Sequence, residues 1–190
     1  RVAIAIRNGG KTEIRVADDG HGMSREDALL CLDRHATSKL GEREDLAEIR
    51  TLGFRGEALP SIAAVSRFTL ETAETGGDGT RISVSAGRIG DVAACARRTG
   101  TTIVVRSLFH NVPARAKFLR STAAEARAVS EVVTSLALAH SAVAFELESN
   151  GRVLLSAEPT SDLRVRIAAL WGDEYAAEMI PVVSTSGAIS

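Results

Sequence analysis

Five consecutive residues, Asp18-Asp19-Gly20-His21-Gly22, combine carboxylates with glycines at the end of an alternating segment. A carboxylate in this place can accept a hydrogen bond from an exocyclic amine, and glycines let a backbone approach a flat ring closely. The same residues are also typical of a tight turn, because Asp-Gly pairs are common turn chemistry. His21 has no second histidine at metal-ligand spacing, so we interpret it as a loop residue.

A second group of polar side chains suits phosphate oxygens. Thr37, Ser38 and Lys39 place two hydroxyls and an ammonium side by side in the chain. Such groups donate charge-assisted hydrogen bonds to phosphate. The alternative is the solvated end of a helix, where Lys39 complements the helix dipole.

Residues 52–59, LGFRGEAL, place two glycines directly ahead of a predicted helix. Glycines permit successive N–H groups to point inward, and a helix start adds unpaired N–H groups, so this segment can cradle an anion. In the alternative, an ordinary loop, Arg55 pairs with an acid and Phe54 is a hydrophobic peg. Thr101, at the start of a later strand, can hydrogen-bond the same ring system, although threonine is also a common strand residue.

Composition limits the class of protein. The chain has 190 residues, of which 45% are apolar and 25% are charged, so we expect a packed core rather than disorder. Its net charge of −1 offers no global basic field for nucleic acid and leaves only a local patch. Cys31 and Cys95 have no metal spacing, and we expect free thiols in a reducing compartment. No apolar run approaches the about 18 residues of a membrane helix, and no signal-peptide pattern opens the chain.

Alternating apolar residues predict the strands that position these groups. Residues 2–6 and 13–17 predict a hairpin that turns on Asn8-Gly9-Gly10. A second hairpin, over 144–148 and 152–155, turns on Asn150-Gly151. Three more strands, separated by glycine-rich turns, are predicted at 68–72, 81–85 and 102–106.

Capping residues predict the helices. Ser24, followed by Asp27, opens a helix that includes residues 28–32, and residues 57–65 predict another in which Pro60 is tolerated in the first turn. A capping box at Thr122 opens a longer helix, and Asp162 caps a helix through Leu170. The apolar face expected for the longer helix is made of Val129, Val132, Val133 and Leu136.

The order of the elements predicts the fold class. Hairpins dominate and βαβ alternation is absent from the pattern, which favours an α+β fold with a mixed, mostly antiparallel sheet and helices on one face. Residues 34–56 are weakly patterned, apart from a short helical stretch at 45–49, and such segments are usually functional lids. We expect one domain over 1–158 and the beginning of a second α/β domain, transducer-like, over 159–190.

Taken together and in this order, the motifs resemble the ATPase superfamily shared by gyrase B, Hsp90, histidine kinases and the mismatch repair protein MutL. RHATSK (residues 34–39), GFRGEAL (53–59) and LFHNVPARAKFL (108–119) are similar to the MutL family specifically. The resemblance runs from about Arg1 to Gly151 and continues weakly beyond. It implies a Bergerat-type ATPase sandwich.

The resemblance also implies a nucleotide site. Asp18 would bind the adenine amine, Thr101 would support it, and Gly20 and Gly22 would line the base. The remaining implied ATP-binding residues, on the phosphate side, are Thr37, Ser38, Lys39, Gly53, Phe54, Arg55, Gly56, Glu57, Ala58 and Leu59. Residues 108–119 would form a structural or interaction segment.

One family motif has no match. The family carries, upstream of the opening hairpin, a helix with Glu-x-x-x-Asn, in which Glu activates water and Asn helps to hold Mg²⁺. We therefore expect this chain to contain no catalytic residue and no metal ligand, and to be nearly inactive as an ATPase. The spacing of Glu146 and Asn150 matches, but along a predicted strand, so we reject that pair. The family's phosphate-sensing lysine and its N-terminal dimerisation arm are also expected outside this chain.

The resemblance implies an ATP-dependent clamp that coordinates DNA mismatch repair, with ATP and Mg²⁺ as cofactors. Implied partners are DNA, other mismatch repair proteins and a second copy in the intact protein, located in the cytoplasm with the nucleoid if prokaryotic. One alternative is a non-hydrolysing interaction module with a vestigial nucleotide pocket. Another is a sister-family ATPase such as a histidine kinase or topoisomerase. The motifs at residues 53–59 and 108–119 argue against this alternative.

Overall fold

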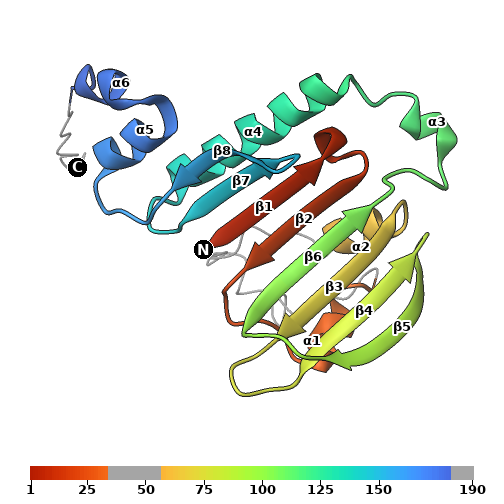
Figure 1. Ribbon diagram of the computed structural model, residues 1–190. Helices are drawn as coiled ribbons and strands as arrows, with labels where there is room; N and C mark the ends of the chain where they lie inside the picture. The colour runs from red at the N-terminus through yellow and green to blue at the C-terminus, as the bar shows by residue number, and fades with distance from the viewer. Residues whose placement is uncertain (34–56, 181–190) are drawn as a thin grey trace, which may run out of the picture.

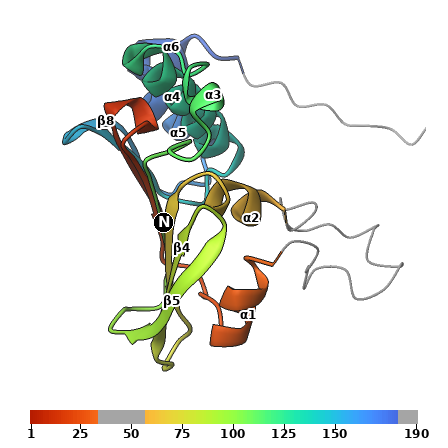
Figure 2. The same cartoon turned by 90° about the vertical axis from the view of Figure 1, so that its right-hand side faces the viewer.

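The fold is an eight-stranded sheet with helices on one of its faces (Figures 1 and 2). A computed structural model describes residues 1–33 and 57–180. The strands are β1 (Val2–Arg7), β2 (Glu13–Asp18), β3 (Arg67–Ala73), β4 (Gly79–Ser85), β5 (Arg88–Cys95), β6 (Gly100–Arg106), β7 (Phe145–Ser149) and β8 (Arg152–Ala157). The helices are α1 (Arg25–Leu30), α2 (Ala58–Ala63), α3 (Pro113–Ala116), α4 (Thr122–Ala139), α5 (Leu163–Trp171) and α6 (Asp173–Ala177), with a 3₁₀ turn at Asn8–Gly10.

The strand order across the sheet is β5-β4-β3-β6-β2-β1-β7-β8. Every neighbouring pair is antiparallel except β1 and β7, which run parallel. The predicted α+β class, with a mixed and mostly antiparallel sheet, is therefore confirmed. This order places the end of β2 beside the start of β6, which brings together two of the predicted site segments.

Alternation along the strands divides the apolar core into two clusters on the helix face. Phe68 and Leu70 of β3 and Ile82 of β4 are fully buried beneath α1 and α2. Ile6 of β1 and Leu147 of β7 are buried beneath α4. Because side chains alternate across a strand, the residues between them point to the opposite face, which no described helix covers (Figure 2).

Both hairpins form as predicted. Asn8, Gly9 and Gly10 have positive φ angles of 52°, 64° and 86° between β1 and β2. Asn150 and Gly151 have φ angles of 52° and 84° between β7 and β8. These left-handed conformations match the twist of the flanking strands, which explains why the turn residues alone predict the hairpins.

Two details of α4 differ from the prediction. The N-cap is Ser121, whose hydroxyl accepts a hydrogen bond from the Ala124 amide at 3.2 Å, so the cap lies one residue before Thr122. The buried face is made of Ala126, Val129, Val133 and Ala137. The prediction was wrong for Val132 and Leu136, which are 60% and 39% exposed, because the helix turns a face containing two alanines, Ala126 and Ala137, toward the core instead.

The segment after β8 is tied to the sheet by a buried arginine. Arg166 of α5 is fully buried and donates hydrogen bonds to the carbonyls of Ser141, Val143 and Glu158 at 2.6, 2.8 and 3.0 Å. Asp162 accepts a hydrogen bond from the Arg164 amide at 2.8 Å and caps α5, as predicted. A domain boundary near residue 158 stays a prediction.

Within residues 1–33 and 57–180, no helix has the length and hydrophobicity needed to cross a membrane.

Candidate functional site

The carboxylate of Asp18 lies at the end of β2 and is held by two backbone amides. Its Oδ1 accepts hydrogen bonds from Gly20 N at 2.9 Å and from Thr101 N at 3.3 Å. Both donors reach the same oxygen, and within the described part of the chain no side-chain or amide donor reaches Oδ2. Asp18 is half-buried. An ionised carboxylate accepts through both oxygens, so Oδ2 is oriented and available to an N–H donor of a ligand.

Two glycines let the backbone close around this carboxylate. Gly100, at φ 117°, lies where an added Cβ would be 2.2 Å from the Asp18 carbonyl oxygen. Gly22, at φ 74°, lies where an added Cβ would be 2.0 Å from the Ala73 carbonyl oxygen. Only glycine fits at either position, because any side chain would collide with backbone in a conformation that it rarely adopts. These glycines thus hold the corner against the ends of β3 and β6.

Thr72, which the sequence analysis did not single out, joins the corner to the sheet. This buried side chain accepts a hydrogen bond from the Met23 amide at 2.9 Å. Its hydroxyl also lies 3.2 Å from the Gly100 carbonyl and 3.1 Å from the Thr101 hydroxyl. Thr72 donates its one hydroxyl proton to the Gly100 carbonyl and can accept from the Thr101 hydroxyl, so the position of Thr101 is fixed through Thr72. In the sequence, Thr72 has only the pattern of an ordinary strand threonine, so no signal there marks it.

The corner leads directly into α1. The hydroxyl of Ser24 accepts a hydrogen bond from the Asp27 amide at 3.1 Å, which confirms the predicted cap. Met23, between the corner and the cap, packs against the core cluster beneath α1 and α2. The core therefore anchors the corner from one side and Thr72 anchors it from the other.

The structure describes three of the predicted phosphate-side residues. Glu57 is the N-cap residue of α2, and Ala58 and Leu59 form its first turn. The first hydrogen bond of α2 runs from Ser61 N to Glu57 O at 3.1 Å, which leaves the amides of Ala58 and Leu59 outside the helix ladder. The other seven, Thr37, Ser38, Lys39, Gly53, Phe54, Arg55 and Gly56, lie outside the described residues, so their role stays a prediction.

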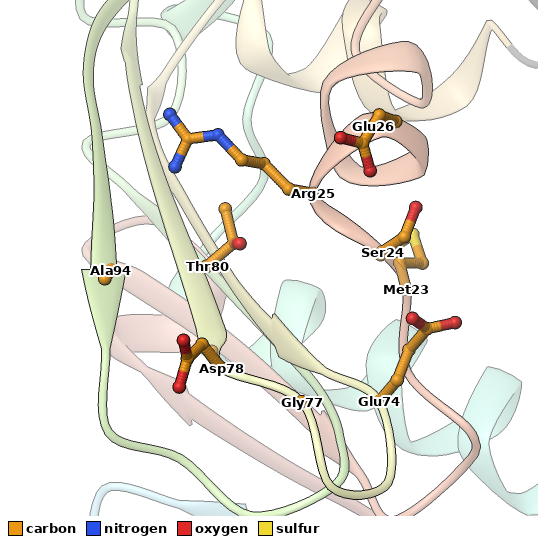
Figure 3. Close-up of a pocket in the computed structure, with 10 residues that line it drawn as sticks. Met23, Ser24, Arg25, Glu26, Glu74, Gly77, Asp78, Thr80 and Ala94 are labelled. Carbon is orange, nitrogen blue, oxygen red and sulfur yellow. The ribbon is translucent and has the colours of Figure 1, made fainter.

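A hollow of about 380 Å³ lies beside the corner, between the start of α1 and the turn after β3 (Figure 3). Arg25 extends across it, and its acidic lining residues are Glu26, Glu74 and Asp78. Asp18 and Thr101 do not line it. Three carboxylates around one arginine disfavour a phosphate group, so this hollow does not take the phosphate end of a nucleotide.

Glu146 and Asn150 lie where the sequence predicted, on a strand and in the turn that follows it. Glu146 lies within strand β7, and Asn150 lies in the following turn, where its side-chain oxygen accepts a hydrogen bond from Asn8 N at 2.9 Å. Residues four apart share a face on a helix but not across a strand and turn. Asn150 therefore braces the tips of two hairpins.

Comparison with known proteins decides the family. No family model matches the chain. The mismatch repair protein MutL of Anaeromyxobacter sp. (strain K) is 50% identical over 189 residues, and the match covers 99% of this chain. The corresponding protein of Gemmatimonas aurantiaca is 45% identical over 188 residues. This chain belongs to the MutL family. It spans 31% of the length of these curated relatives.

Solved structures show the same fold. The Aquifex aeolicus MutL ATPase domain complexed with ADP is 31% identical, with a TM-score of 0.69, and the match covers 90% of this chain and 60% of that one. The N-terminal domain of a DNA repair protein has a TM-score of 0.74 at 25% identity, covering 90% of this chain and 51% of that one. The Bergerat-type fold implied by the resemblance is therefore confirmed.

Proposed function

We propose that this chain is the nucleotide-binding part of a MutL-like ATPase, and that Asp18 recognises the exocyclic amine of adenine. One observation supports this most directly: two amides hold Asp18 Oδ1, while Oδ2 faces no described donor. Adenine carries an N–H donor that fits such an acceptor. The related Aquifex domain that was solved with ADP has the same fold.

The corner supplies the remaining contacts to the base. Thr101 presents a hydroxyl beside Asp18, and Gly20 and Gly22 offer backbone without side chains. The amides of Ala58 and Leu59 would receive phosphate oxygens, together with the seven predicted residues between 37 and 56. Since α2 begins at Ala58, its positive dipole end would add to this attraction.

Hydrolysis is a property that we assign to the whole protein. None of the residues matched to the nucleotide site is placed as a general base, so the 190-residue chain should bind nucleotide and turn it over very slowly. Loss of a general base costs about 10²–10⁴ in rate. Mg²⁺, when bound to the nucleotide, would neutralise phosphate charge. Within residues 1–33 and 57–180 there is no cluster of three or more His, Cys, Asp or Glu side chains that could hold a metal ion, and we assign no Mg²⁺ ligand to these residues.

For the whole protein we propose an ATP-driven clamp in mismatch repair. Nucleotide binding would close the lid and drive two copies together around DNA, where other repair proteins would join them. A cytoplasmic location would fit the bacterial relatives. We retain a division into a nucleotide-binding domain over 1–158 and the start of a second domain over 159–190.

Nucleotide titration tests this proposal. We expect the chain to bind ATP and ADP by calorimetry, and Asp18→Asn to weaken both by about 10–100-fold, since hydrogen bonds to charged groups contribute about 1.5–3 kcal/mol. Asp78→Asn, in the neighbouring hollow, is the matched control and should leave both affinities unchanged. A folded chain that binds neither nucleotide would contradict the proposal and favour an interaction module.

A further inference from the structure

The face of the sheet opposite the helices carries a concentration of positive charge. Arg7 of β1, Arg15 of β2, Arg67 of β3 and Arg106 of β6 are all exposed there; we call these four residues the arginine ridge. Their sequence neighbours on the same strands, such as Ile6, Phe68 and Val105, are buried against the helices. Alternation therefore places all four arginines on the open face. Their strands, β3, β6, β2 and β1, are neighbours in the sheet (Figure 1).

Strand register aligns three of the four in one row. Arg67 pairs with Arg106, Arg106 with Glu13, and Glu13 with Arg7. Arg15 lies two residues from Glu13, on the same face of β2. Neighbouring strands lie about 4.8 Å apart, and two residues along a strand span about 7 Å, so the row is about 14 Å long and Arg15 stands close beside it.

The ridge is not neutralised by its neighbours. Glu13 accepts from Arg106 Nε at 2.7 Å and lies 3.7 Å from Arg7 Nε, so one carboxylate serves two arginines. Arg15 and Arg67 have no ion pair among the described residues. The four arginines and Glu13 together carry a charge of 4 − 1 = +3 in a chain whose net charge is −1. In the same rows, Glu148 lies two strands from Arg15 and Arg88 lies two strands from Arg67, so these two outer charges offset each other. Arg67 directly opposite Arg106 is a like-charge pair, which is unfavourable without an anion between the two groups.

We propose that the arginine ridge binds the phosphate backbone of double-stranded nucleic acid. The ridge proposal rests on the proposed function, in which DNA is a partner. It adds which surface of this domain contacts the DNA. Guanidinium groups bind phosphate in a bidentate manner, and one DNA strand carries a phosphate every 3.4 Å of helix rise, so about four phosphates fall within the length of the row.

The side chains on the open face favour binding of a duplex over binding of a single strand. The open-face positions of these four strands carry glycine, alanine, threonine, valine and charged residues, without an aromatic side chain on which an unpaired base could stack. The ridge also lies at the end of the sheet where Arg7 pairs with Glu13, whereas Asp18 lies at the other end opposite Val2. Duplex and nucleotide therefore occupy separate surfaces.

Duplex binding by the 190-residue chain tests the ridge. A fluorescent 30-base-pair duplex of mixed sequence is titrated at salt concentrations from 50 to 200 mM. Each phosphate contact contributes about 0.9 to the slope of log K against log salt, so Arg15→Gln with Arg67→Gln should lower the slope by about 1.8. Arg127→Gln, an exposed arginine on α4, is the matched control and should leave the slope unchanged.

Glu13→Gln should change duplex affinity in the opposite direction to the arginine substitutions, which a purely structural role of the ridge would not predict. Removing the carboxylate releases Arg7 and Arg106, so duplex affinity at 50 mM salt should rise several-fold. ATP affinity, measured separately, should stay unchanged in all these variants, so failure of the ridge and failure of the nucleotide site are distinguishable. Equal slopes in the ridge and control variants would overturn the proposal. If polyglutamate displaced the labelled duplex as strongly as unlabelled duplex does, the proposal would also be overturned, and an acidic protein partner would be favoured.

Discussion

The hydroxyl oxygen of Thr72 accepts a hydrogen bond from the backbone amide of Met23 at 2.9 Å. This bond connects the buried end of β3 to the glycine-rich corner that carries Asp18. The same hydroxyl contacts the Gly100 carbonyl and the Thr101 hydroxyl. A single buried side chain thus sets the distance between the two segments that we propose to hold adenine.

Thr72→Val should therefore weaken both stability and nucleotide binding. Valine keeps the shape but leaves the Met23 amide without its partner, which costs about 1–3 kcal/mol of unfolding free energy. Urea unfolding and calorimetry with ADP measure the two effects. Thr102→Val, a buried threonine on the opposite face of β6, is the control and should change the unfolding free energy by less than about 0.5 kcal/mol. If the two variants behaved alike, the Thr72 network would have no special role.

Gly22→Ala should be far more costly than Gly76→Ala. Both glycines have nearly the same positive φ angle, 74° and 75°. The left-handed conformation alone costs about 1–2 kcal/mol for alanine, and this is all that Gly76 would lose, since nothing lies within 4 Å of its added Cβ. At Gly22 the Cβ would be 2.0 Å from the Ala73 carbonyl oxygen, so the corner must shift away from β3. Urea unfolding should separate the variants by at least about 1 kcal/mol; equal losses would mean that the corner is not tightly held.

Much of this architecture could be predicted from local signals. Asn-Gly turns specify the two hairpins because they supply positive φ angles, and Ser24 and Asp162 mark helix starts because their side chains accept from free amides. Asp18 meets the amides of Gly20 and Thr101 because β2 and β6 are neighbours, while the role of these residues toward a nucleotide stays a prediction.

Features that depend on packing could not be predicted. Strand β5 was missed, because Gly90 and Asp91 interrupt its alternation and its pairing with β4 shifts register at Ser83. The face of α4 was misjudged because sequence patterns favour large residues over Ala126 and Ala137, which make the close contact. Thr72 acts only through partners that are distant in the chain.

The thiol of Cys31 should make stability depend on pH in alkaline solution. Burial raises its pKa from 9.0 to about 11, and the nearby Asp27 carboxylate acts in the same direction. The native state therefore keeps this proton after the unfolded chain has lost it. This thiol should leave the unfolding free energy unchanged below pH 9.0, lower it as the pH rises from 9.0 to about 11, and have no further effect at higher pH.

Other groups also titrate in that range, so Cys31→Ala is the necessary comparison. The difference in unfolding free energy between the wild-type chain and Cys31→Ala, measured by urea unfolding, should decrease across this interval. A constant difference would show that the Cys31 thiol is solvated rather than buried.

If Asp18 Oδ2 accepts a hydrogen bond from the amine of adenine, the chain must distinguish ATP from inosine triphosphate. Inosine carries a carbonyl oxygen in place of the amine. Because Gly20 and Thr101 donate to Oδ1, the side-chain amide introduced by Asp18→Asn would keep its oxygen toward them, and its NH₂ group would replace Oδ2. We predict that the wild-type chain prefers ATP by about 10–100-fold and that Asp18→Asn reduces or reverses this preference. Equal affinities of the wild-type chain for the two nucleotides, or an equal loss of both affinities in the variant, would show that Asp18 does not bind the amine.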